Sequence, residues 1–214
     1  MEKKTESKQA FKALSKICLN NWHYIERKVL SFSEGINFFT GHSGSGKSTI
    51  VKLLARFYDV QTGVIEIGGK DLKTVNPENL YSHLSMVFQD VYLFKDTILN
   101  NIRVGNQTAS FEEVVAAAKK AHCHEFISAL PDGYETLVGE GGSTLSGGEK
   151  QRISIARAFI KQSEIILLDE ATAALDLENE AGVQQAIKNL VADKTVIVIA
   201  HRLKTIMKAD QIVV

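Results

Sequence analysis

The residues with the clearest chemical potential lie in the segment GHSGSGKST, which matches the phosphate-binding pattern GxxxxGK[ST] at every fixed position. Glycines let such a loop wrap a polyphosphate with backbone N–H groups, and the helix predicted directly after it adds a favourable dipole. Lys47 is expected to reach the β- and γ-phosphates, and the Ser48 hydroxyl is expected to bind Mg²⁺. The residues predicted to hold the nucleotide phosphates are Gly41, His42, Ser43, Gly44, Ser45, Gly46, Lys47, Ser48 and Thr49.

Two carboxylates, Asp169 and Glu170, follow the apolar run at residues 165–168. In open α/β sheets, ligands bind at the carboxyl ends of the strands. We therefore expect Asp169 to hold Mg²⁺, directly or through water, and Glu170 to act as general base for a water that attacks the γ-phosphate, a role worth about 10²–10⁴-fold in rate. The pattern LLDE alone usually only marks the end of a strand. Together with a phosphate loop, it indicates nucleotide hydrolysis.

His201 stands at the end of a second apolar run, residues 195–200. A lone histidine in such a position is more often structural than catalytic. Because its strand is expected to lie beside the strand of Asp169, we favour a polar contact with the γ-phosphate or with Glu170.

A second glycine pair stands in TLSGGEKQR, residues 144–152, at the start of a predicted helix. Bare backbone N–H groups and the positive end of a helix dipole can bind an anion there as well. The sequence therefore contains two candidate phosphate sites, although one small domain needs only one to hold a nucleotide.

The two cysteines, Cys18 and Cys123, stand far apart and in no spacing typical of a metal site or a disulfide framework. A reducing cytoplasm is therefore the default location. The triplet His122-Cys123-His124 invites a metal interpretation. We reject it because consecutive residues on a helix point in different directions.

The elements that would position these residues follow from the spacing of apolar residues. Strands are predicted at residues 36–40, 64–67, 165–168 and 195–200, with one more near 212–214. A helix is predicted from Ser48 to about 57, and another starts at Ser110, where Glu113 completes a capping box, and continues through EEVVAAAKKAHCHEFISAL. Further helices are predicted from Gly148 through EKQRISIARAFI and at residues 178–191 and 202–208. This alternation predicts one compact α/β unit with a mostly parallel sheet covered on both faces.

The totals exclude several classes of protein. The 214 residues suit one domain, and 25 basic residues against 25 acidic ones leave no bulk charge that would favour nucleic acid or an anionic membrane surface. The first ten residues are too polar for a secretory signal, and no apolar run approaches the length of a membrane span. We expect a soluble chain, linked to a membrane only through a partner or a missing segment.

The motifs follow one another in an order found in a single large family: the phosphate loop, Gln89 within VFQD, LSGGEKQR, IILLDEATAALD and IAHR. With them, the chain strongly resembles the nucleotide-binding domain of an ATP-binding-cassette (ABC) transporter, from about Ile36 to its end. Finer stretches resemble the exporter branch: LLARFYDVQTGVIEIGGKDL, residues 93–103, ALPDGYETLVGEGG and AAAKKAHCHEFI. The resemblance implies the P-loop NTPase fold, with a mostly parallel sheet core, a small antiparallel β subdomain and a helical subdomain that bears the signature motif.

The resemblance also implies domain bounds and further roles. The cassette would span residues 14–214, with the Q-loop and helical subdomain at roughly 90–160. Residues 1–13 are lysine-rich and terminal, so we expect them to form a flexible N-terminus. Gln89 would touch Mg²⁺ or the attacking water and sense the membrane domain, whose coupling helix would rest on residues 92–96. Residues 138–140 would communicate between the two halves. Tyr24, with Trp22 as the alternative, would stack on adenine.

Two further groups of residues take their roles from the resemblance alone. The signature residues that would clasp a γ-phosphate held by a partner's phosphate loop are Ser146, Gly147, Gly148 and Glu149. The D-loop would be formed by Ala174, Leu175 and Asp176.

The implied function is ATP binding and hydrolysis in an ABC exporter at the cytoplasmic face of a membrane, with ATP and Mg²⁺ as cofactors. Two cassettes, identical or different, would close head to tail on ATP and drive a transmembrane-domain partner, and no nucleic acid is expected. One alternative is a soluble DNA-maintenance ATPase, but its long coiled coils need heptads that residues 48–145 lack. Another is a non-catalytic nucleotide sensor, which the intact carboxylate pair and His201 disfavour. Because the sequence stops within the last predicted strand, we expect an excised, truncated or split cassette.

Overall fold

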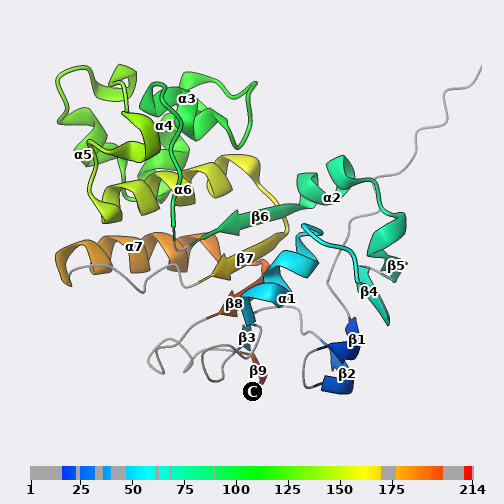
Figure 1. The fold of residues 1–214 in the computed structure, drawn as a ribbon. Helices are drawn as coiled ribbons and strands as arrows, with labels where there is room; N and C mark the ends of the chain where they lie inside the picture. Colours follow the sequence, from blue (N-terminus) through cyan, green and yellow to red (C-terminus); the bar gives the residue numbers. More distant parts are fainter. Residues whose placement is uncertain are drawn as a thin grey trace, which may run out of the picture.

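The computed structural model describes residues 16–22, 25–31, 36–39, 47–60, 63–67, 69–88, 90–169, 177–199 and 210–213. Its centre is a five-stranded sheet in the order β6-β7-β8-β3-β9, in which every neighbouring pair of strands is parallel (Figure 1). The strands are β3 (Ile36–Phe39), β6 (Leu84–Val87), β7 (Ile165–Asp169), β8 (Thr195–Ile199) and β9 (Gln211–Val213). The predicted parallel sheet is thereby confirmed.

Both faces of this sheet are covered, which explains why its central strands are apolar without interruption. Side chains alternate across a strand, so Ile166 and Leu168 of β7 join one core, whereas Ile165 and Leu167 join the other. The residues of β8 divide between the two cores in the same way. A parallel sheet that is buried on both sides is therefore encoded by a continuous apolar run.

A second sheet is antiparallel and has the strand order β2-β1-β4-β5. Its strands are β1 (Lys16–Trp22), β2 (Ile25–Ser31), β4 (Gly63–Ile67) and β5 (Lys70–Asp71). Ile65 and Ile67 of β4 enter the smaller core, which α1 (Lys47–Leu54) and α2 (Pro77–His83) share with β7. The predicted small antiparallel subdomain is present.

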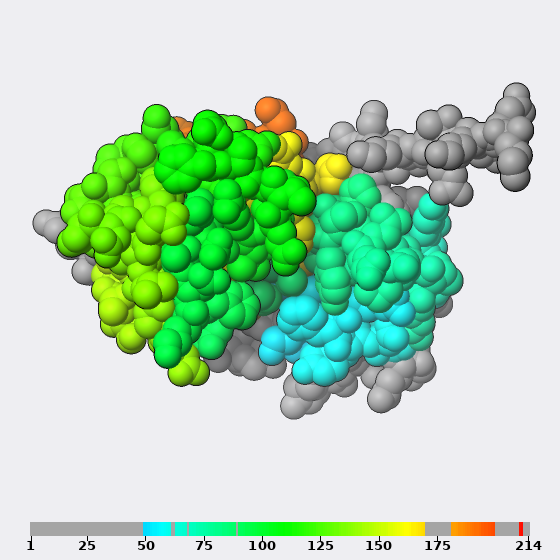
Figure 2. Space-filling view, turned by 90° about the horizontal axis from the view of Figure 1, so that it is seen from above, coloured from blue at the N-terminus to red at the C-terminus, as the bar shows by residue number. Residues whose placement is uncertain are grey.

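The remaining helices gather on the other side of the parallel sheet, in the green, yellow and orange part of Figure 1. They are α3 (Ile98–Arg103), α4 (Phe111–Lys120), α5 (His124–Ser128), α6 (Gly147–Lys161) and α7 (Leu177–Leu190). α6 is central to the group, since it contacts α3, α4, α7 and β6. Figure 2 shows this helical part beside the part formed by α1, α2 and β4. No helix in the described part of the chain is both long enough and apolar enough to cross a bilayer.

The helix start predicted at Ser110 is confirmed. The Ser110 Oγ accepts the Glu113 N–H at 3.2 Å, and the Glu113 carboxylate accepts the Ser110 N–H at 2.7 Å. This reciprocal pair is a capping box, which provides partners for two backbone N–H groups at the start of α4.

The single helix predicted from there through residue 130 is wrong, because the structure divides it into α4 and α5. His122 takes a left-handed conformation with φ 55°. The Cys123 N–H then donates to the Ala118 carbonyl at 2.9 Å, and the His122 N–H donates to the Lys119 carbonyl at 3.1 Å. These two bonds form a Schellman motif, which ends a helix. Its usual sequence signal is a glycine, and here a histidine stands in that position.

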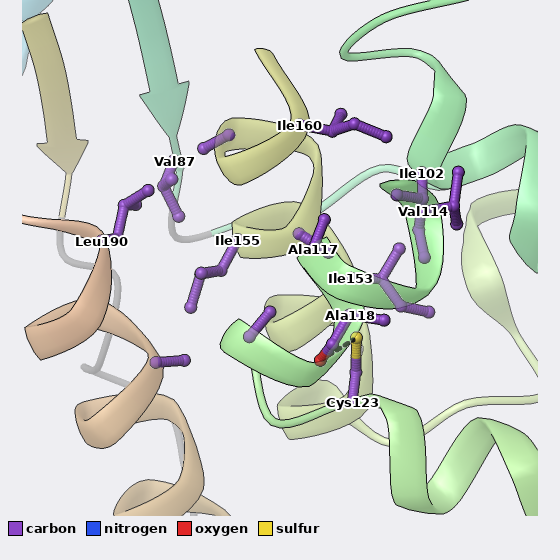
Figure 3. Close-up of a cluster of buried hydrophobic side chains, with 14 of the residues drawn as sticks. Val87, Ile102, Val114, Ala117, Ala118, Cys123, Ile153, Ile155, Ile160 and Leu190 are labelled. Atoms are coloured by element: carbon purple, nitrogen blue, oxygen red, sulfur yellow. Dashed lines mark hydrogen bonds between the residues drawn. The ribbon is translucent and has the colours of Figure 1, made fainter. Parts of the chain in front are cut away.

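The break between α4 and α5 also sends the three side chains of the His-Cys-His triplet to different places. Cys123 is fully buried, where its Sγ lies 3.4 Å from the Ala118 carbonyl and burial raises the pKa of its thiol to about 12 (Figure 3). The His122 ring lies 3.5 Å from the Asn189 amide, while His124 Nδ1 lies 3.0 Å from the hydroxyl of Tyr134. The three side chains thus point in different directions, as expected, and this argues against a metal site. The cause is the break between α4 and α5 and not the geometry of one continuous helix.

The other predicted helices and strands agree with the structure to within a few residues at their ends. The predicted helix at 202–208 and the N-terminal residues 1–13 lie outside the described residues.

Candidate functional site

The core strands of the parallel sheet end in register at one edge. Phe39 of β3 pairs with Ile199 of β8, and Ile199 pairs with Asp169 of β7. Val87 of β6 pairs with Leu168, which places the end of β6 beside them. Each strand leads directly into a predicted catalytic segment: the phosphate loop, Gln89, Glu170 and His201. All four segments therefore start from the edge at which open α/β sheets bind their ligands.

Most of the predicted site residues lie outside the described residues. They are Tyr24, Gly41, His42, Ser43, Gly44, Ser45, Gly46, Gln89, Glu170, Ala174, Leu175, Asp176 and His201. Lys47 and Ser48 are placed by their backbone, whereas Thr49, Asp169 and residues 146–149 are described with their side chains.

α1 begins at Lys47, directly after the predicted phosphate loop. Its first turn contains no acidic residue, so no carboxylate on the helix competes with an anion at the positive end of the dipole. α1 contacts β7 and β8, and its buried residues Val51 and Leu54 hold it there. Asp169 is the half-buried last residue of β7, and its carboxylate is the kind of ligand that Mg²⁺ prefers. The start of α1 and Asp169 together suit a metal-bound polyphosphate.

α6 begins with a capping box of its own. The Ser146 Oγ accepts the Glu149 N–H at 3.3 Å, and the Glu149 carboxylate accepts the Ser146 N–H at 2.8 Å. The helix starts at Gly147, one residue before the predicted start. Since Gly147 and Gly148 stand in the first turn, their N–H groups have no acceptor inside the helix. The Ser146 hydroxyl uses its oxygen in the box and keeps its hydrogen for a further acceptor.

Polar side chains of α6 hold the loop that follows β6. Gln151 Nε2 donates to the Phe88 carbonyl at 3.2 Å. Further along α6, Arg157 donates from Nη1 to the Tyr92 carbonyl at 2.8 Å and from Nε to the Asn101 carbonyl at 2.6 Å. Burial lowers the pKa of Arg157 to about 10, a value at which the guanidinium stays charged at neutral pH. α6 therefore fixes this loop at two points along its length.

Asn101 of α3 folds the same loop into a compact turn. Its side chain is fully buried, its Oδ1 accepts the Phe94 N–H at 2.9 Å, and its Nδ2 donates to the Phe94 and Thr97 carbonyls at 3.0 Å each. Arg157 Nη2 donates to the same Oδ1 at 2.6 Å. One buried amide thus links the loop, α3 and α6.

A groove of about 340 Å³ lies between this loop, α3 and α6. Six of the residues that line it are Phe88, Tyr92, Phe94, Val104, Arg157 and Lys161. Tyr92 is 56% exposed, and Phe94 and Val104 are each 50% exposed. Exposed apolar side chains around a groove are typical of protein docking sites. The groove takes in part of the segment 92–96, on which the family resemblance predicts that a coupling helix rests.

The segment at 138–140 is tied to the same loop. The Val138 N–H donates to the Asp96 carbonyl at 2.9 Å, and the Gly141 N–H donates to the Leu93 carbonyl at 3.1 Å. Lys150 of α6 donates to the Gly141 carbonyl at 3.4 Å. The two predicted communication segments and the signature helix thus form one hydrogen-bonded unit.

Sequence reasoning missed Asn101, Gln151 and Arg157. The available signal was helical spacing, because Gln151 lies four residues before the buried Ile155 and seven before the buried Ala158. A long polar side chain on the buried face of a helix needs a partner, although its spacing cannot name that partner.

Comparisons with known proteins point to one family. A family model described as ABC transporter matches residues 29–173. Mouse (Mus musculus) ATP-binding cassette sub-family B member 6 is 55% identical over 174 residues, which cover 81% of this chain and 21% of that protein. The mouse mitochondrial potassium channel ATP-binding subunit is 53% identical over 199 residues, which cover 92% of this chain and 28% of that protein.

A solved structure of a bacterial Atm1-family ABC exporter with ATP bound matches this chain with a TM-score of 0.80 and 42% sequence identity. The matched part covers 94% of this chain and 36% of the exporter chain. This chain spans no more than 36% of the length of these three proteins. Because the family model covers more than half of the chain, the predicted resemblance and fold are confirmed. The chain belongs to the ABC transporter family, as an ATP-hydrolysing nucleotide-binding domain of the exporter type.

Proposed function

We propose that this chain drives export by closing head to tail on ATP with a second cassette. The observation that carries the proposal is the pair of helix starts, at Lys47 after the phosphate loop and at Gly147 after Ser146. One copy would hold ATP at the first start and cover its partner's ATP with the second. A single chain would then supply two half-sites.

The residues of one copy would bind the nucleotide and activate water. Lys47 and the loop N–H groups would hold the phosphates, and oxygen donors from Ser48, Asp169 and Gln89 would suit Mg²⁺. Bound Mg²⁺ would neutralise charge on the β- and γ-phosphate oxygens. Glu170 would take the proton of the attacking water. His201 would hydrogen-bond to the γ-phosphate or to Glu170.

The second copy would complete the site through α6. The N–H groups of Gly147 and Gly148 and the Ser146 hydroxyl would donate to the γ-phosphate, while Glu149 would act by holding Ser146 in the capping box. The residues that we keep as the D-loop are Ala174, Leu175 and Asp176, with Tyr24 as the aromatic that stacks on adenine.

The membrane partner would dock in the groove beside Tyr92 and Phe94 and place the chain at the cytoplasmic face of a membrane. The solved exporter is much longer than this chain, so its remaining length leaves room for such a partner, fused or separate. We propose the cassette to span residues 14–214 and its helical subdomain roughly 90–160. Movement of α6 would reach the groove through Arg157, which belongs to this helix, lines the groove and donates to the Tyr92 carbonyl.

Mixed dimers test the shared site. A Ser146→Ala chain paired with a Lys47→Ala chain forms one doubly damaged site and one intact site. We expect the mixture to turn over ATP faster than either variant does alone. If mixed dimers form, as shown by differently tagged chains, but turnover does not rise above that of the single variants, the shared-site proposal fails.

The role of Glu170 is tested separately by Glu170→Gln, which keeps the size of the side chain and removes the base. We expect this variant to bind ATP, to lose at least roughly 10²-fold in turnover, and to accumulate as an ATP-bound dimer in size-exclusion chromatography. Turnover at the wild-type rate would remove the assigned role. Such turnover would also show that the chain hydrolyses ATP with another general base, and so would argue against a non-catalytic sensor.

A further inference from the structure

Gln151 is a buried polar residue whose presence packing alone does not explain. Its side chain is 3% exposed, on the face of α6 that also buries Ile155 and Ala158. An amide in such a place costs free energy unless it finds a hydrogen-bond partner, whereas an apolar side chain of equal size would simply fill the space. Its partner is the Phe88 carbonyl, which stands 63 residues earlier in the chain.

The carbonyl that Gln151 holds belongs to the peptide group between Phe88 and Gln89. A peptide group is planar, so an interaction that fixes its oxygen also fixes the direction of the following Cα atom. Gln151 therefore holds the carbonyl of Phe88, the residue that directly follows β6.

Phe88 is also held from a second side. Its ring lies 6.3 Å, centre to centre, from the ring of Phe57, which stands in the turn after α1. α1 begins at Lys47, and α6 begins at Gly147. Phe88 thus contacts the end of one helix and the side of the other, and these two helices start at the two proposed half-sites.

We infer that Gln151 is a positioning residue, through which the signature end of α6 orients the peptide group of Gln89. Gln151 lies five residues after Ser146, which is about 7.5 Å along a helix axis. A shift of α6 caused by a partner's nucleotide would reach the Phe88 carbonyl through one rigid helix and one hydrogen bond. The inference rests on the proposed function, because the catalytic role of Gln89 is part of that proposal.

Gln151→Met tests the contact, since methionine keeps the length of the side chain and removes the donor. Measured on the full chain, kcat for ATP should fall about five- to tenfold, the effect expected for one lost hydrogen bond, while the KM for ATP stays the same. Gln151→Asn keeps the amide on a shorter side chain that no longer reaches the carbonyl, and its kcat should fall by the same factor. The matched control is Ser163→Ala, which removes a buried hydrogen bond to Ser85 and should lower stability without lowering kcat.

A double-mutant cycle with Gln89→Ala separates positioning from general damage. If Gln151 acts through Gln89, adding Gln151→Met to Gln89→Ala should lower kcat no further. If the kcat losses of the two single variants multiply in the double variant, the inference is overturned and the role of Gln89 remains intact. Wild-type kcat in both Gln151 variants would have the same meaning. Wild-type kcat in Gln89→Ala would instead refute the proposed role of Gln89, and the inference with it.

Discussion

α4 and α6 begin with the same hydrogen-bonded device but present different first turns. Each starts after a serine whose Oγ accepts the N–H three residues later, and in each a glutamate at that position accepts the N–H of the serine. Corresponding bond lengths in the two boxes differ by only 0.1 Å, since they are 2.7 and 3.2 Å in α4 and 2.8 and 3.3 Å in α6. Phe111 and Glu112 follow the serine of α4, whereas Gly147 and Gly148 follow the serine of α6.

The difference separates the cap of a helix from a proposed ligand site. Phe111 lies edge-on to Tyr134 at 5.4 Å between ring centres, and Glu112 adds a negative charge to the same turn. An approaching anion would meet the Glu112 carboxylate at α4. At α6 it would meet the N–H groups of Gly147 and Gly148, while the Glu149 carboxylate accepts the Ser146 N–H. The capping box is thus a structural device common to both helices, and the glycine pair is the part that we propose to bind phosphate.

The largest effect is expected from Gly147→Glu, which adds a second carboxylate to the first turn of α6, so that this turn has two acidic residues as that of α4 does. ATP turnover should fall roughly 10²–10³-fold because a carboxylate would repel the γ-phosphate. The melting temperature should barely change, since an acidic residue suits the start of a helix. Phe111→Gly is the reciprocal control at α4 and should leave turnover unchanged. Wild-type turnover in Gly147→Glu would show that the glycine pair does not face the phosphate.

A smaller effect should distinguish the two capping serines. Ser146→Ala and Ser110→Ala should each cost about 1 kcal/mol of unfolding free energy, measured by urea denaturation, because each removes an N-cap. Only Ser146→Ala should also reduce turnover, by about tenfold, since it alone loses a donor to the phosphate. Equal losses of turnover in the two variants would mean that activity simply follows stability.

The smallest effect concerns pH at the start of α4. Hydrogen bonds from its own backbone N–H and from the Ser110 hydroxyl hold the pKa of Glu112 below its ordinary value. A carboxyl with a lowered pKa in the folded state contributes stability that is lost as the pH falls through that pKa. Below pH 4.5, hydrogen-exchange protection of the Glu113 N–H in α4 should therefore decline, whereas protection of the matching Glu149 N–H in α6 should persist, because Gly148 stands there in the position of Glu112. An NMR titration should also show a higher pKa of Glu112 in Ser110→Ala; an unchanged value would contradict the assigned cause.

Features that depend on neighbouring residues could be predicted from the sequence. The capping box at Ser110 follows from a serine and a glutamate three residues apart, and the strand that ends at Asp169 follows from four apolar residues. The shared edge of the sheet also follows, because parallel strands bring their carboxyl ends together.

Features that depend on distant residues could not be predicted. The contact of Gln151 with Phe88 joins residues 63 apart, and that of Arg157 with Asn101 joins residues 56 apart. Nothing in either local sequence identifies the partner. The break at His122 was missed for a different reason, since its backbone conformation favours glycine and the chain places a histidine there.

The strand order of the parallel sheet has a consequence for how the chain folds during its synthesis. Among the described strands, β3 pairs with β8 and β9 alone, so that Ile36 pairs with Val196 and Phe39 with Val213 only after those residues have been synthesised. At a translation rate of about 5–20 residues per second, β3 spends roughly 8–30 seconds outside the ribosome before its first partner strand emerges. Throughout that interval, the strand that leads into the phosphate loop has no partner in the sheet, so the ATP site is among the last parts of the molecule to form.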